Sequence, residues 1–191
     1  MHKKIKEILQ EIKTSEIRML TKAVCKKHHD KLITEPAACG NHHAYEGGLL
    51  HHLHSTAMLA GKICDHYPDV KINRDVAVAG AFLHDIGKVE CYKKIEEEDA
   101  RRKYKSTDST LLFHHIPIGY YIVRSIHDIS ETNISEKDLF GILHIIISHH
   151  GRKEYSSPRT PRTDEARIAA EADFIDAYMN ADHNGKAIYG K

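Results

Sequence analysis

Histidine is the residue type whose frequency most sets this sequence apart. It occupies 17 of 191 positions, several of them adjacent pairs. Imidazole nitrogens combined with carboxylate oxygens are typical ligands of Mn, Fe, Co, Ni and Zn. The histidines and aspartates that could do chemistry fall at particular places along the predicted helices, and they are His52, His84, Asp85, His115, His149, His150 and Asp173.

Their placement alternates between helix starts and helix ends. His52 lies in the first turn of a predicted helix, and the His84-Asp85 pair lies in the last turn of the next. Consecutive helices joined by short connections run antiparallel in bundles, so a start followed by an end brings both groups to the same end of the bundle.

The same alternation repeats further along the chain. His115 lies in a first turn, and the His149-His150 pair lies in a last turn. Asp173, in the middle of the last predicted helix, can complete the cluster if that helix crosses the others at an angle. The alternative is that helix-end histidines merely cap carbonyls and complement the helix dipole, but this leaves the first-turn histidines unexplained.

Five histidines and two aspartates exceed the three or four protein ligands that one tetrahedral ion takes. Two divalent transition-metal ions that share Asp85 fit the number better, and Mn is favoured among Mn, Fe, Co, Ni and Zn. Such a pair activates a bridging hydroxide and holds both the attacking and the leaving oxygen of a phosphorus centre. In this hypothesis Asp85 and Lys88 are catalytic, and Lys88, Arg152 and Arg159 bind substrate phosphate.

The elements that must position these residues are helical, because apolar residues recur three and four positions apart with no sustained alternation. The sequence therefore predicts an all-α fold. Helices are expected at about 5–12, 17–24, 49–67, 74–86, 115–126, 135–150 and 163–179. Thr14 or Ser15 can cap the second helix and Ser135 the sixth, with Gly87 and Gly151 as stops.

Composition narrows the remaining possibilities. With 41% hydrophobic residues the chain can build one core, and 28 basic against 27 acidic residues give a net charge of +1, so no global field attracts long nucleic acid or a membrane. Apolar stretches are short, and the four cysteines follow no disulfide pattern, which favours a reduced, cytoplasmic protein. The charged segment 93–110 is expected to form a short solvated helix or a flap, and could be a lid.

Longer strings carry a family resemblance. The order His52, His84-Asp85 and Asp173 resembles the HD-domain metal-dependent phosphohydrolases. The sequence is also similar to the HD half of the YhaM-type 3′→5′ exoribonucleases, through the strings HHAYEGGLLHH (42–52), AGAFLHDIGK (79–88), HIPIG (115–119), ISHHGRKEYSSPRTPRTDEA (147–166) and EADFIDA (171–177).

This resemblance implies an all-helical HD domain, which we place at 36–179. Hydrophobic spacing predicts N-terminal helices at 1–35 that pack on it, and the polar tail at 180–191 is expected to fray. The resemblance also implies that His52, His84, Asp85 and Asp173 bind one metal. By the same resemblance, His115, His149 and His150 bind a second, as in HD proteins that cleave phosphodiesters.

The expected function is phosphodiester cleavage at short nucleic-acid ends, in oligonucleotides or in cyclic nucleotides. The YhaM-type enzymes carry an OB-fold module before the HD region, and the predicted helices here leave no room for one, so long RNA is not the expected substrate. The alternatives are a nucleotide phosphomonoesterase that uses mainly the first ion and a non-catalytic nucleotide-binding HD module. An oligomer is possible.

Overall fold

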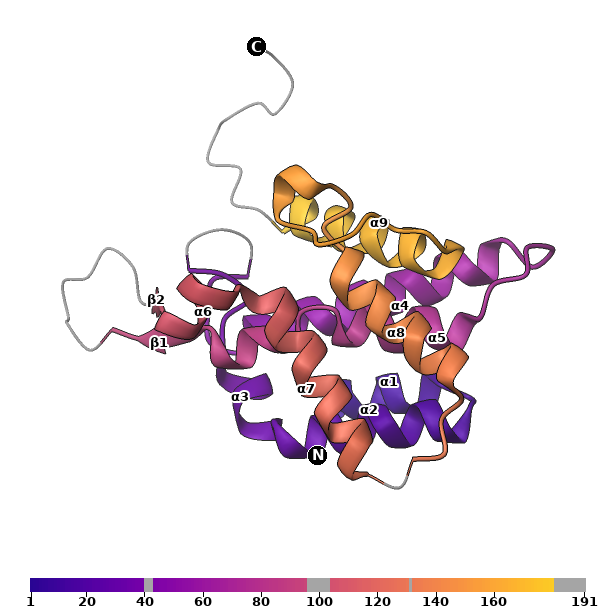
Figure 1. The fold of residues 1–191 in the computed structure, drawn as a ribbon, viewed down its shortest axis with the longest axis horizontal. Helices are drawn as coiled ribbons and strands as arrows, with labels where there is room; N and C mark the ends of the chain where they lie inside the picture. The colour runs from indigo at the N-terminus through magenta and orange to yellow at the C-terminus, as the bar shows by residue number, and fades with distance from the viewer. Residues whose placement is uncertain (40–42, 96–103, 131, 181–191) are drawn as a thin grey trace, which may run out of the picture.

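The computed structural model describes residues 1–39, 43–95, 104–130 and 132–180 (Figure 1). Two expectations concern other parts of the chain. The frayed tail beyond residue 180 and the centre of the charged segment, at 96–103, lie outside the described residues, and so does the proposed lid in that centre.

The described chain is mainly helical, which confirms the predicted fold class. Its helices are α1 (Lys3–Glu11), α2 (Ser15–Lys27), α3 (His29–Thr34), α4 (Gly48–His66), α5 (Arg74–Leu83), α6 (Asp108–Phe113), α7 (His115–Ile129), α8 (Glu136–Ser148) and α9 (Asp164–Met179). Two 3₁₀ turns, η1 (Ile86–Glu90) and η2 (Lys153–Tyr155), and an antiparallel pair of strands, β1 (Tyr92–Lys94) and β2 (Tyr104–Ser106), complete it.

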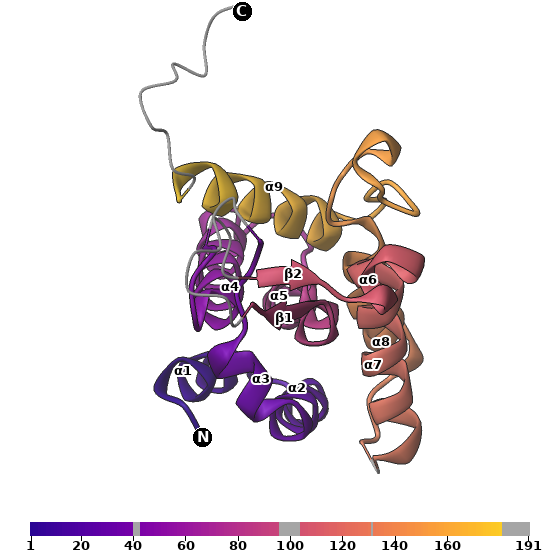
Figure 2. The same cartoon turned by 90° about the vertical axis from the view of Figure 1, so that its left-hand side faces the viewer.

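The helices that carry the histidines form the centre of the molecule. Helix α4 packs along α5, α5 packs on α8, and α7 packs on η1 and α8, while α9 lies across α4, α5 and α8 (Figures 1 and 2). This crossing is the one that Asp173 requires. Helices α1 to α3 lie on the side of α4 and α5 opposite to α9 (Figure 2).

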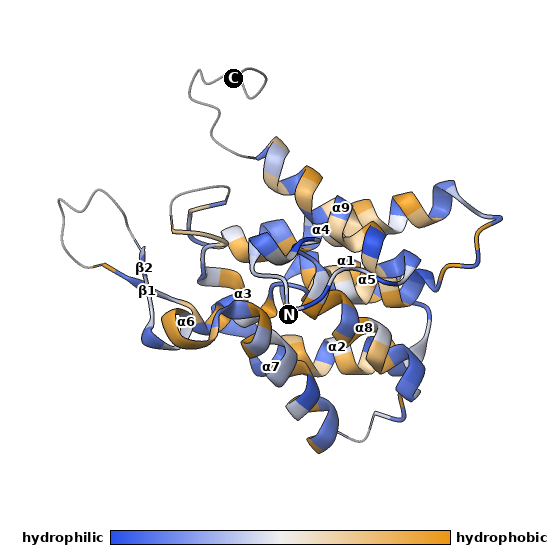
Figure 3. Cartoon of the chain, turned by 45° about the horizontal axis from the view of Figure 1, so that its top comes forward, coloured by the Kyte–Doolittle hydropathy of each residue, from blue (hydrophilic) through white to orange (hydrophobic). Residues whose placement is uncertain are grey.

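One hydrophobic cluster runs through both the N-terminal helices and the central ones. The apolar positions Ile5 and Ile8 of α1 are fully buried in it together with Leu53 of α4, Phe82 of α5 and Ile142 of α8. Coloured by hydropathy, helix α9 alternates between polar and apolar segments along its length (Figure 3). Its apolar residues buried against the core are Ala166, Ala169 and Ala172. Burial of the residues of this cluster, at about 25 cal/mol per Å² of apolar surface, holds the bundle in register.

Several predicted helix ends have the expected chemistry. The Ser135 hydroxyl accepts a hydrogen bond from the Asp138 N–H at 3.1 Å, and Gly151 follows α8 with φ +74°. Thr14 is at the N-cap of α2, but its hydroxyl donates to Asp75 at 2.7 Å instead of capping the helix.

The prediction that Gly87 stops a helix over 74–86 is wrong. Helix α5 ends at Leu83, and the chain continues through Asp85 into η1. Gly87 has a different role, because a Cβ there would lie 2.0 Å from the carbonyl oxygen of His115 and 2.7 Å from the Gly119 nitrogen. The missing side chain lets the start of α7 press against η1, and this contact brings His115 towards Asp85.

Strands β1 and β2 pair antiparallel within the charged segment, which agrees with a flap, and helix α6 begins at the end of the segment, at Asp108. The short helices α3 and α6 were not predicted. In the part of the chain that the structure describes, no helix is both long enough and apolar enough to cross a bilayer.

Candidate metal centre

The seven predicted residues converge at the ends of four helices and on the face of a fifth. His52 comes from α4 and Asp173 from α9, while the rest lie where α5 and α8 end and where α7 begins. Five of them are buried, and His150 and Asp173 are partly exposed. The structure thus brings the predicted set together, and its role as a set of metal ligands remains a prediction.

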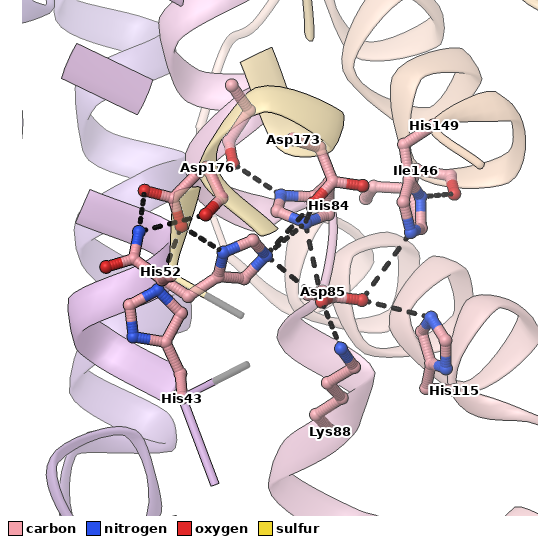
Figure 4. Close-up of polar contacts among 12 residues, drawn as sticks. His43, His52, His84, Asp85, Lys88, His115, Ile146, His149, Asp173 and Asp176 are labelled. Atoms are coloured by element: carbon pink, nitrogen blue, oxygen red, sulfur yellow. Dashed lines mark hydrogen bonds and ion pairs between the residues drawn. The ribbon is translucent and has the colours of Figure 1, made fainter. Parts of the chain in front are cut away.

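Asp85 lies at the centre of the cluster, with histidines on both sides of its carboxylate (Figure 4). Its Oδ2 lies 3.5 Å from His52 Nε2 and 3.4 Å from His84 Nε2. Its Oδ1 lies 3.0 Å from His115 Nε2 and 3.5 Å from His149 Nε2. The two oxygens therefore belong to two different groups of histidines.

Asp173 closes the first of these groups. Its Oδ1 lies 3.1 Å from His52 Nε2 and 3.4 Å from His84 Nε2. On the second side, ligand atoms of His115, His149 and His150 lie within 4.8 Å of one another. Each group contains at least three potential ligands, which is the usual number for a catalytic ion.

The histidines at the ends of α5 and α8 combine capping with ligand geometry. His84 Nδ1 donates to the Ala81 carbonyl at 2.7 Å, and His149 Nδ1 donates to the Ile146 carbonyl at 2.8 Å. A carbonyl only accepts, so each Nδ1 carries the proton and each Nε2 faces the cluster with a lone pair available when the ring is neutral. Helix capping and metal binding are compatible here, because they use different nitrogens.

Three atoms on the second side test whether a cation fits. Asp85 Oδ1, His115 Nε2 and His149 Nε2 are buried, and among the described residues they face one another at 3.0 and 3.5 Å without the geometry of a hydrogen bond. A buried polar atom without a partner costs about 1–3 kcal/mol. Three of them facing one another are explained most simply by a positive ion that all three would hold.

The ionisation of the carboxylates favours such a site. Burial alone would raise the pKa of Asp85, but the Lys88 ammonium and the rings of His84 and His115 hold it well below its usual range. Burial would also raise the pKa of Asp173, but His84 and His52 outweigh it and hold this pKa well below its usual range. Both side chains therefore remain negative at any pH where the protein would work.

The pKa values of the histidines differ between the two groups. Burial lowers the pKa of His52 and His84, but the surrounding carboxylates outweigh it and raise the pKa of His52 well above its usual range and that of His84 to about 9. Burial lowers the pKa of His115 to about 3, against the pull of Asp85. An ion must displace protons from the first group, whereas His115 is already neutral.

Lys88 is buried in the site and contacts Asp85, with its Nζ 2.5 Å from Oδ2. A pocket of about 770 Å³ opens beside the cluster, and Lys88 and Arg152 line it, while their role in binding substrate remains a prediction. Arg159 is not among the described residues that line the pocket, and its charge lowers the pKa of His144 instead. Arg167 of α9, which was not among the predicted substrate-binding residues, also lines the pocket.

Asp176 is a functional candidate that was not singled out in the sequence, and it contacts His43, a histidine of the string 42–52. Asp176 Oδ2 accepts from His52 Nδ1 at 2.8 Å and from His43 Nε2 at 3.0 Å, and all three side chains are buried. A signal for Asp176 existed, because it follows Asp173 by three positions and so lies on the same helix face. His43 lies in the loop before α4, so the sequence marked it as a neighbour of the site but did not fix its partner.

The HD domain family matches residues 49–178, which span α4 to α9 and contain all seven residues of the cluster. The chain therefore belongs to the HD domain family. No solved structure matches it.

Within this family, its curated relatives include the 3′-5′ exoribonucleases YhaM. The protein of Listeria welshimeri is 36% identical over 183 residues, covering 94% of this chain and 54% of the relative. That of Bacillus subtilis is 34% identical over 176 residues, covering 92% and 53%. This confirms the resemblance drawn from the motifs, and the chain spans about half the length of these relatives.

Proposed function

We propose that this protein is a phosphodiesterase that uses two divalent metal ions and acts on short nucleic-acid ends, oligonucleotides or cyclic nucleotides. One observation carries the proposal: the two oxygens of Asp85 face two separate groups of histidines. A carboxylate placed between two ligand groups is what a pair of ions needs as a bridge, and two ions suit a diester because they contact both the attacking and the leaving oxygen.

The metal ions would supply a lowered pKa for bound water and neutralisation of phosphate charge. His52, His84 and Asp173 would hold one ion, His115, His149 and His150 the other, and Asp85 both. Lys88 keeps its positive charge, because the attraction of Asp85 outweighs the effect of burial and raises its pKa. It orients the bridging carboxylate, and Arg152 at the pocket rim binds a non-bridging oxygen of the substrate.

A nucleotide is the favoured substrate because of the composition of the pocket wall. Exposed aromatic rings of Tyr155 and Phe174 line it beside the cations Arg152 and Arg167. Aromatic rings stack on nucleobases, and arginines bind phosphate. The YhaM relatives are 3′-5′ exoribonucleases, which supports a substrate with a nucleic-acid end. The same proposal includes a cytoplasmic location. Free cysteines are typical of a reducing compartment, and Cys25, Cys64 and Cys91 are buried thiols.

The test is elemental analysis of the purified protein, combined with hydrolysis of bis(p-nitrophenyl) phosphate and of the corresponding monoester. Two ions per chain and cleavage of the diester support the proposal. One ion with monoester cleavage points to a phosphomonoesterase, and neither metal nor hydrolysis points to a nucleotide-binding module.

Manganese is expected to activate the enzyme better than magnesium. The cluster offers five imidazoles, whereas Mg²⁺ prefers oxygen ligands and keeps several waters. EDTA should abolish hydrolysis, and adding each ion back to the chelated protein measures the preference. Better recovery with Mg²⁺ than with Mn²⁺ would contradict a histidine-rich ligand set.

Turnover is expected to be no better on a long single-stranded RNA than on a dinucleotide or tetranucleotide. Among the described residues, Arg152 and Arg167 are the cations that line the pocket besides Lys88, which Asp85 already pairs, so few phosphates are engaged at once. The slope of log K against log salt should be about −1 to −3, because each single-strand contact contributes about −0.7. Competition between labelled oligomers measures this, and a marked rise of kcat/KM with length would restore the role of a processive exoribonuclease.

A further inference from the structure

A chain of hydrogen bonds leads from the protein surface to the side of His52 that faces away from the metal cluster. Its inner part is Asp176, whose Oδ2 lies 2.8 Å from His52 Nδ1 and 3.0 Å from His43 Nε2 (Figure 4). Its outer part is the Tyr45 hydroxyl, which lies 3.0 Å from His43 Nδ1 and 2.6 Å from His51 Nδ1. The chain therefore connects exposed Tyr45 and His51 to a fully buried candidate ligand.

The chemistry of the acceptor fixes where the protons are at its inner end. Asp176 Oδ2 lies within hydrogen-bond distance of two ring nitrogens at once, His52 Nδ1 and His43 Nε2, and all three side chains are buried. An ionised carboxylate has no proton to give. Both histidine nitrogens that contact it must then be donors, so the proton of His52 is held on Nδ1 and its Nε2 points at Asp85 and Asp173.

His43 supports this carboxylate from the opposite side. With the proton of His43 on Nε2, its Nδ1 accepts from the Tyr45 hydroxyl, and the Tyr45 oxygen in turn accepts from His51 Nδ1. Every contact in the chain is then satisfied in one direction. The other oxygen of Asp176 accepts from the Asn180 side-chain amide at 3.2 Å, so the carboxylate is held at both ends.

An unusual backbone conformation and a close contact with α4 place His43 at this position. Its backbone has φ +51°, a left-handed conformation that is uncommon outside glycine and that is found at functional sites. Its carbonyl oxygen would lie 2.1 Å from a Cβ on residue 48, which is Gly48, the first residue of α4. The absence of a side chain there lets the loop that carries His43 lie against the helix that carries His52.

We propose that Asp176, supported by His43, is a positioning residue that holds His52 with its proton on Nδ1 and its Nε2 directed at the metal site. This inference rests on the proposed function, since it assigns a device to the same site. Carboxylate partners of metal-binding histidines orient the ring and raise its basicity, and their loss costs about 10- to 100-fold in metal affinity or activity.

The experiment compares Zn²⁺ affinity, measured by competition with a chromophoric chelator, in the wild type, Asp176→Ala, Asp176→Asn and His43→Ala. We expect affinity for the more tightly held ion to fall about 10- to 100-fold in Asp176→Ala. Asp176→Asn keeps an acceptor oxygen without the charge, so its loss should be smaller, and His43→Ala should lie between it and the wild type.

The matched control is Glu7→Gln. Glu7 Oε2 contacts His54 Nε2 at 2.9 Å, so it too is a carboxylate bound to a histidine of α4, but His54 belongs to none of the candidate metal groups among the described residues. Zn²⁺ affinity should be unchanged in this variant. Thermal unfolding in EDTA shows whether each variant folds, and if Asp176→Ala does not, Asp176→Asn and His43→Ala decide.

The second readout is the Nδ1–H proton resonance of His52, recorded with and without Zn²⁺. In the wild type it should be shifted downfield and protected from exchange with water, and in Asp176→Ala this protection should be lost. A folded Asp176→Ala that binds Zn²⁺ like the wild type, or an ion bound at His52 Nδ1 between His43 and Asp176, would overturn the inference. If the wild type binds no metal but shows the protected proton, the proposed function is contradicted, whereas the orientation of His52 by Asp176 is supported.

Discussion

Replacing Asp85 with asparagine is expected to reduce hydrolysis of bis(p-nitrophenyl) phosphate by about 10³-fold or more and to remove metal from both positions. The side chain keeps its shape but loses the charge that its two oxygens present to two groups of histidines. If each ion contributes several kcal/mol to the transition state, loss of both exceeds a thousandfold, since 1.36 kcal/mol corresponds to a factor of ten. Steady-state rates and metal content per chain measure the effect.

The alanine variant should be equally inactive but less stable. Lys88 loses its partner in Asp85→Ala, and removing one member of a buried ion pair costs about 3–5 kcal/mol. Asp85→Asn is therefore the cleaner test of chemistry, and Asp128→Asn is the control, because Asp128 also contacts a histidine but lies exposed on α7. Full activity with two bound ions in Asp85→Asn would contradict the proposal that Asp85 bridges the two ions.

The convergence of the cluster could be predicted because it depends on local rules only. Helical periodicity located the helices, and short connections made them antiparallel, so residues at alternating ends had to meet. His52 and His84 are the first pair to meet in this way, with their Nε2 atoms 3.2 Å apart. Asp173 needed a helix that crosses the others, and α9 does so.

What the sequence left open depends on contacts between distant segments. Gly87 looked like a helix stop because glycine often ends helices, but its role is to let the backbone of His115 approach. Arg159 and Arg167 both follow the His149-His150 pair within 18 residues, and the sequence alone could not tell which of them lines the pocket, whereas the structure places Arg167 there. His43 is placed by a left-handed backbone conformation in a loop that no periodicity describes.

A substitution on the second side of Asp85 separates the two ions. His115→Ala is expected to leave close to one ion per chain, because it removes one of the imidazoles that face Asp85 Oδ1 and leaves the His52, His84 and Asp173 group intact. His150→Ala should behave in the same way, since its ring belongs to the same group. Metal analysis after dialysis measures the loss.

The loss of this ion should damage diester cleavage more than monoester cleavage. A diester needs its attacking and leaving oxygens stabilised together, whereas a monoester can be cleaved with one ion and the nearby cations. We expect the ratio of the two activities to fall about tenfold or more in His115→Ala, which corresponds to a differential loss of about 1.4 kcal/mol in the transition state. The control is His127→Ala, because His127 lies in the last turn of α7, at the end of the helix opposite to His115. A His115→Ala protein that retains two ions and an unchanged ratio would mean that the second group of histidines does not hold a catalytic ion.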